Sequence, residues 1–162
     1  MRFDSDELAG IVDLLGPLTE AELADAAHEA AFREGTVDEL AVEADLAEAL
    51  ERWALVRVPA DRHDGAGTGD GEPLLVVGPT AFPVVPPGGE DLPHILDLPP
   101  RGGLRAAAAA TVRERFERAV ETAIDAEDAD RAADLLDLSY DLDAWAGIDV
   151  AAERERLDAL LD

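Results

Sequence analysis

The chain has 162 residues, of which 38 are acidic, 13 are Arg and none is Lys, Asn, Gln or Cys, so its formal net charge is −25. The missing Cys excludes disulfides, thiolate zinc sites and cysteine nucleophiles, and the missing Lys excludes a P-loop. No run approaches the roughly 18 apolar residues of a membrane span, and the first residues hold no apolar signal region, which predicts a cytoplasmic protein without membrane contact.

Helical periodicity dominates the N-terminal part of the chain. The spacing of its apolar residues predicts helices over 6–15, 20–34 and roughly 37–52. Capping boxes, in which a Thr hydroxyl and a Glu carboxylate satisfy each other's backbone N–H groups, are expected to open the second and third helices, at Thr19–Glu22 and Thr36–Glu39.

Two short apolar runs then predict a β-hairpin. Residues 53–59 and 72–79 have the composition of strands, and the segment between them is polar and rich in Gly. Helices followed by a hairpin with a long tip form the element order of a winged helix, which residues 6–79 resemble. The resemblance implies a unit that often binds DNA.

A Pro-rich segment follows the hairpin and contains seven of the ten prolines of the chain, within 79–100. Proline at this density is incompatible with a helix interior or a central strand. The many apolar residues predict a buried strap, 80–102, that covers the core and joins the two halves of the chain, with Phe82 and residues 94–96 buried. The alternative is an exposed linker whose apolar, Pro-rich run docks a partner. Its candidate partner contacts are Phe82, His94, Ile95 and Leu96.

The C-terminal part is predicted to be helical again. A long helix over about 104–126 leads through an acidic turn into a second helix, and a short helix ends the chain. Residues 116–142 resemble a hairpin of the tetratricopeptide type, with Ala at the helix crossing. A solenoid needs about three stacked units, so one hairpin predicts no superhelical groove.

The expected fold is therefore mainly α with a small β-hairpin. We expect a winged-helix-like unit at 1–79, the Pro-rich strap at 80–102, and a helical hairpin with a short terminal helix at 103–162.

The acidity has two interpretations. A high net charge with few aromatic residues is typical of disordered chains, but here the apolar residues are ordered at helical spacing between caps. We favour adaptation to molar salt, where a Debye length of about 3 Å screens the charge repulsion. Together with the segments "LLVVGPTAFP" and "EDLPHILD", the composition resembles a family of short uncharacterised proteins from halophilic archaea. That resemblance implies a habitat and no activity.

One segment, 101–118, is basic, with five Arg and two acidic residues. Its candidate contacts with nucleic acid or a partner are Arg101, Arg105, Arg113 and Arg115. Arg113 has Glu117 at i+4. Arg101 and Arg105 lie where a helix dipole disfavours cations, which predicts an acidic tertiary partner for both. The predicted third helix holds six acidic residues and, at its far end, Arg52, so base readout is disfavoured. We interpret the basic segment as structural.

Catalytic chemistry finds little support in the remaining residues. Neither Ser5 nor Ser139 lies in a nucleophile motif, and a lone histidine such as His94 is more often structural than a ligand. We expect no enzyme, no metal and no cofactor. The favoured function is a non-catalytic interaction or adaptor module with a protein partner. The alternatives are a DNA-associated winged-helix regulator and a small-molecule or metal sensor near His94.

Overall fold

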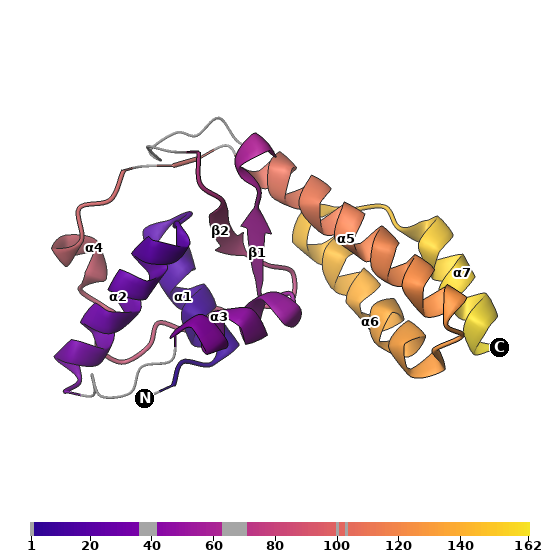
Figure 1. Ribbon diagram of the computed structural model, residues 1–162, viewed down its shortest axis with the longest axis horizontal. Coiled ribbons are helices and arrows are strands. Elements are labelled where there is room, and N and C mark those ends of the chain that lie inside the picture. The colour runs from indigo at the N-terminus through magenta and orange to yellow at the C-terminus, as the bar shows by residue number, and fades with distance from the viewer. Residues whose placement is uncertain (1, 36–41, 63–70, 100, 103) are drawn as a thin grey trace. The chain divides into compact units, whose positions relative to one another are not determined.

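The computed structural model describes residues 2–35, 42–62, 71–99, 101–102 and 104–162. These residues are mainly helical with one small antiparallel sheet, which confirms the expected fold class (Figure 1). The chain divides into two compact units, Met1–Ala108 and Ala109–Asp162, with the boundary inside helix α5 (Arg105–Asp125). None of the described helices is both long and apolar enough to cross a bilayer.

Helices α1 (Ser5–Leu15), α2 (Glu20–Arg33) and α3 (Val42–Glu51) build the N-terminal unit. The predicted capping box of Thr19 and Glu22 is present at the start of α2, and Asp4 with Glu7 forms another at the start of α1. Residues 36–41, which include the predicted Thr36–Glu39 box, lie outside the described residues.

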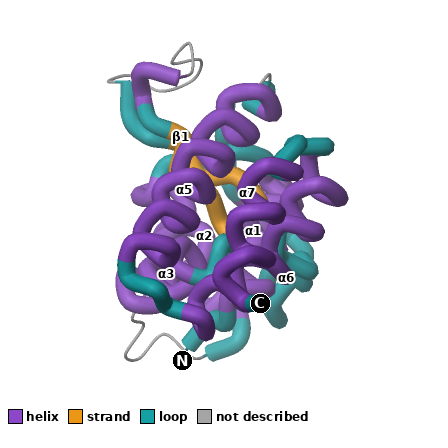
Figure 2. Tube along the Cα trace, turned by 90° about the vertical axis from the view of Figure 1, so that its right-hand side faces the viewer, coloured by secondary structure: helices purple, strands orange, loops and turns teal. Residues whose placement is uncertain are grey.

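The predicted hairpin is present as strands β1 (Leu55–Val58) and β2 (Leu74–Val77), which pair antiparallel and are orange in Figure 2. A single 3₁₀ turn, η1 (Ala60–Arg62), follows β1. Leu18, between α1 and α2, forms an isolated antiparallel bridge with Leu75 of β2, through backbone hydrogen bonds of 2.7 and 3.2 Å. The segment between α1 and α2 therefore pairs with β2 through a single residue, Leu18.

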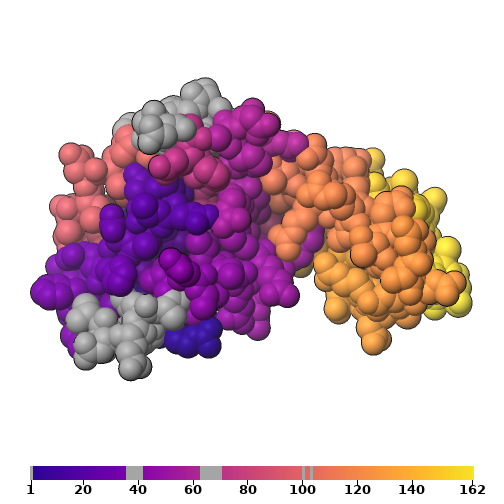
Figure 3. Space-filling model, viewed as in Figure 1, coloured from indigo at the N-terminus to yellow at the C-terminus, as the bar shows by residue number. Residues whose placement is uncertain are grey.

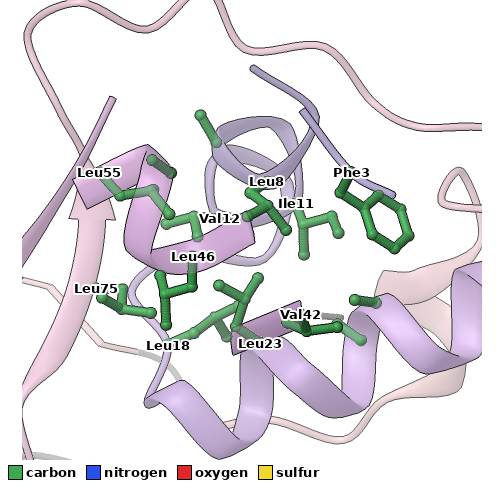
Figure 4. Packing of buried hydrophobic residues seen from close by; sticks show 14 of the residues in the cluster. Phe3, Leu8, Ile11, Val12, Leu18, Leu23, Val42, Leu46, Leu55 and Leu75 are labelled. Atoms are coloured by element: carbon green, nitrogen blue, oxygen red, sulfur yellow. The ribbon is translucent and has the colours of Figure 1, made fainter. Parts of the chain in front are cut away.

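Leucine and other aliphatic side chains from each of these elements form the core of this unit (Figure 4). Leu8 and Ile11 of α1 meet Leu23 of α2 and Leu46 of α3, and all four are buried. Alanines line most of the inner face of α2, at positions 26, 27, 30 and 31, which lets its neighbours pack close to the helix axis.

The Pro-rich strap contains turns at residues 87–88 and 90–91 and one helical turn, α4 (Leu92–Ile95), which was not predicted. Pro93 lies in the first turn of α4, where its missing N–H leaves no helical bond unmade. Helix α4 packs on α1 and α2, and its residues lie beside α2 on the surface of the unit (Figures 1 and 3).

The C-terminal unit consists of α5 from Ala109 onward, α6 (Ala129–Ala146) and α7 (Ala151–Leu161). Its buried side chains include Phe116 of α5, Leu135 and Leu142 of α6, and Leu157 of α7. Arg154 of α7 fastens α7 to α6, since its Nε donates to Ser139 Oγ at 2.8 Å and its guanidinium lies 4.4 Å from the Tyr140 ring centroid.

Candidate interaction surface on the N-terminal unit

The strap is attached to the start of α1 by its backbone. The N–H of Phe82 donates to the Asp6 carboxylate, and the N–H of Val84 donates to the Asp6 carbonyl, both at 3.0 Å. Because both groups belong to one residue in the first turn of α1, they hold this part of the strap in a single register on the helix.

Gly10 makes this contact possible. A Cβ atom at Gly10 would lie 1.9 Å from the Val84 carbonyl oxygen, which is far inside van der Waals contact. The strap backbone therefore rests directly on α1, where the missing side chain of Gly10 leaves room for it. No larger residue fits at this position without moving the strap.

The strap presents its apolar side chains to solvent. Phe82 is 79% exposed, Val84 52% and Val85 40%. The prediction that Phe82 is buried is wrong, because the backbone of this segment, and not its side chains, faces the helix. We call Phe82, Val84 and Val85 the apolar row.

The buried positions of the strap lie further along the chain. Leu92 of α4 is fully buried in the core, and Pro86 is buried as well. Among the predicted contact residues, Leu96 is partly buried against the core, whereas Ile95 is 40% exposed and His94 is exposed. The strap is thus held by its backbone at one end and by Leu92 at the other.

A second attachment joins the strap to the end of α2. Gly88 has a positive φ of 83°, and a Cβ there would lie 2.3 Å from the Ala30 carbonyl oxygen. Arg33 Nη2 binds Asp91 Oδ2 at 2.9 Å just beyond this contact. The end of α2 and the strap therefore form one continuous surface.

A hollow of about 470 Å³ lies at this attachment. It is lined by Phe32, Arg33 and Glu34 from the end of α2 and by Gly88, Glu90 and Asp91 from the strap. Phe32 is 68% exposed, a large aromatic side chain left in solvent at the rim of an acidic hollow. Phe32 was not among the residues predicted to be functional. Its position outside the buried alanine face of α2 is the feature of the sequence that indicates its exposure.

Arg101 is a structural cation. Its side chain is 2% exposed, its Nη2 donates to Glu22 Oε2 at 3.0 Å, and its Nη1 donates to the Pro17 carbonyl at 3.0 Å. Partial burial raises the pKa of Glu22, but hydrogen bonds from Arg101 and from the Thr19 backbone outweigh this and hold the pKa below its ordinary value. The prediction of an acidic tertiary partner for Arg101 is confirmed.

The other candidate cations lie along α5. Arg113 binds Glu117 Oε1 at 3.1 Å, as its spacing predicts, and also donates to the Asp149 carbonyl at 2.8 Å. Arg115 is partly buried, and Arg105 is exposed with no ion pair to another described residue. The acidic partner predicted for Arg105 is therefore not found among the described residues. Arg101 and Arg113 are thus engaged within the chain. Their role as contacts for nucleic acid or a partner stays a prediction, as it does for Arg105 and Arg115.

A charged groove of about 640 Å³ lies between α5 and α7 and contains both signs of charge. Arg156 Nη1 binds Glu121 Oε1 at 2.7 Å across it, and this hydrogen bond lowers the pKa of Glu121 and raises that of Arg156. Arg156 and Glu121 therefore neutralise each other across the groove.

Ser139 has its hydrogen bonds satisfied within the C-terminal unit. It is fully buried, donates from Oγ to the Leu136 carbonyl at 2.6 Å, and accepts the Nε–H of Arg154. Within the part of the chain that the structure describes, no group of three or more His, Asp or Glu side chains could hold a metal ion. The site that stands out is the surface of the apolar row and the hollow.

Comparison with known proteins gives one finding. No curated protein matches the chain, and no solved structure matches it. A family model matches residues 6–162, nearly the whole length, and agrees with the expectation of an uncharacterised family. The chain belongs to DUF7109, a family of unknown function.

Proposed function

We propose that this protein is a non-catalytic interaction module whose N-terminal unit docks a protein partner on the apolar row. The observation that carries the proposal is that Phe82, Val84 and Val85 are exposed while the backbone beneath them is held by Asp6. Burying exposed apolar surface drives association, and a segment already fixed in place loses little conformational entropy when it binds.

Aromatic side chains supply much of the energy of protein interfaces, which makes Phe82 the expected anchor. A linear Pro-rich ligand for a groove would need a free backbone, whereas this strap is attached to α1 and α2. The row therefore acts as a preformed surface that receives a partner.

The order of α1, α2, α3 and the hairpin, with the Leu18–Leu75 bridge as a third short strand position, supports a winged-helix arrangement for this unit. This bridge favours DNA association as the second candidate function. Glu43, Glu48 and Glu51 on α3 count against it, because phosphate contacts need cations. Fluorescence anisotropy with duplex DNA tests it, and salt-sensitive binding that Arg105→Ala weakens would support it.

We further propose that the protein works in a cytoplasm of high salt. The net charge of −25 and a basic complement made only of Arg support this setting. Acidic surface groups retain water and cations, and molar salt screens their mutual repulsion.

Site-specific crosslinking in the native cytoplasm tests the interaction function. A photo-crosslinking amino acid replaces Phe82 in one variant and, as a control, Tyr140 in another, since Tyr140 is 60% exposed on the C-terminal unit. We expect a discrete protein adduct from position 82 that is absent from position 140. Identical adduct patterns from the two positions would rule out docking on the apolar row.

A further inference from the structure

The hollow beside the apolar row has two kinds of wall. Phe32 offers an aromatic face that is 68% exposed. Glu34 and Glu90 offer carboxylates that make no ion pair with another described residue, whereas Asp91 is already bound to Arg33 at 2.9 Å. The hollow therefore combines one exposed ring with two carboxylates that have no ion-pair partner among the described residues.

An aromatic face beside carboxylates matches the chemistry of a guanidinium group. A guanidinium stacks on a ring with its flat face and donates hydrogen bonds to carboxylates from its edge, so the two kinds of wall can bind it together. The ammonium group of lysine is a compact and strongly hydrated charge that cannot make both contacts in one plane. The hollow thus favours arginine over lysine.

The hollow continues the apolar row. A Cβ at Gly89 would lie 3.2 Å from Val85 Cγ1, so the Val85 side chain lies against the residue next to Gly88, which lines the hollow. A segment that covers Val85 therefore reaches the hollow within a short length of chain. One bound segment can present apolar side chains to the row and a cation to Phe32.

We propose that this composite surface binds a segment of a partner protein that carries apolar residues and an arginine, with the arginine in the Phe32 hollow. Charge complementarity at contact distance supports this occupant, because Glu34 and Glu90 line the hollow and make no ion pair with another described residue. The inference rests on the proposed interaction function and adds the chemistry of the partner.

The test uses a fluorescent amphipathic peptide with Leu on one face and Arg on the other, and its Lys counterpart, titrated with the full-length protein in molar KCl. Molar salt screens contacts between exposed charges, so a general attraction to an acidic protein is suppressed. We expect the Arg peptide to bind roughly threefold more tightly than the Lys peptide. We expect Phe32→Ala to weaken binding of the Arg peptide by roughly three- to fivefold. The difference in affinity between the Arg and Lys peptides should also become smaller.

Matched variants separate the hollow from general acidity. Glu34→Gln with Glu90→Gln removes two charges at the hollow, and Asp13→Asn with Glu43→Gln removes two exposed charges elsewhere on the same unit. Only the first pair is expected to weaken binding of the Arg peptide. The four carboxylates and the Phe32 ring are all exposed, and circular dichroism checks that each variant is folded.

Three outcomes overturn the proposal. Equal affinities for the Arg and Lys peptides, or equal effects of the two double variants that remove charges, would rule out the arginine site. Both outcomes would leave the docking function unaffected. Sedimentation of the chain as a dimer that Phe32→Ala dissociates would assign the surface to a second copy. Identical crosslinking patterns at positions 82 and 140, by contrast, would rule out the docking function itself.

Discussion

Replacing Glu22 with Gln should destabilise the N-terminal unit through the loss of one charge. Gln can still complete the capping box with Thr19, so the start of α2 keeps its backbone hydrogen bonds. What is lost is the charge that compensates Arg101, whose side chain is 2% exposed. Leaving a fully buried ion uncompensated costs about 3 to 5 kcal/mol. Because the Glu22 side chain keeps 20% of its exposure, we expect about 2 to 3 kcal/mol.

Glu7→Gln is the matched control for this experiment. Glu7 completes the same kind of capping box at the start of α1, with the Asp4 N–H at 3.1 Å, but makes no ion pair with another described residue. We expect its cost to stay within about 0.5 kcal/mol, measured by urea denaturation with circular dichroism in molar KCl. Equal losses for the two variants would refute the reasoning, because the loss would then come from the capping box and not from the buried ion pair.

The pH dependence gives an independent measure of the same pair. The pKa of Glu22 is lowered in the folded state, so its contribution is fully present above the ordinary pKa of a glutamate. The contribution is lost as the pH falls through the lowered folded-state pKa. The free energy of unfolding of Glu22→Gln should therefore fall less steeply than that of the parent over this acidic range.

Three further predictions concern the strap and the charge. Phe82→Ala should change the free energy of unfolding by no more than about 0.5 kcal/mol, because the side chain is exposed. Leu92→Ala, at a fully buried position, should lower it by about 2 to 4 kcal/mol. Urea denaturation curves with the same midpoint for both variants would contradict this. Gly10→Ala should push the strap away from α1 and speed hydrogen exchange at the Val84 amide. Gly102→Ala is the control, because a Cβ there meets no atom within 4 Å, and it should leave this exchange unchanged. An unchanged exchange rate at Val84 in both variants would show that the strap does not rest on Gly10. Lowering KCl from molar to below about 0.1 M should reduce helix content measured by circular dichroism, and a cooperative fold that persists at low salt would oppose salt adaptation.

Local sequence was sufficient for most of the helices and for the hairpin. The capping box at Thr19 and the period of the apolar residues act within a few residues of the chain, so the start of α2 and its inner face follow from them. The Arg113–Glu117 ion pair is of the same kind, since a separation of four residues brings two side chains together on any helix.

The orientation of the strap required the tertiary structure. A Pro-rich segment has no hydrophobic period, so a count of its apolar residues predicts burial without saying which side chains turn inward. Gly10 decided the outcome, because a bare helix surface lets the strap backbone approach and leaves Phe82 and Val84 outside.

The partners of charged side chains were equally beyond the sequence. Arg101 binds Glu22, 79 residues away, and the hollow beside Phe32 is also lined by Glu90 and Asp91, which lie far along the chain. In a chain with 38 acidic residues, each cation has many candidate partners of the same chemistry. Only packing selects among them, because an ion pair is strong where the core brings the two groups together and removes water from between them.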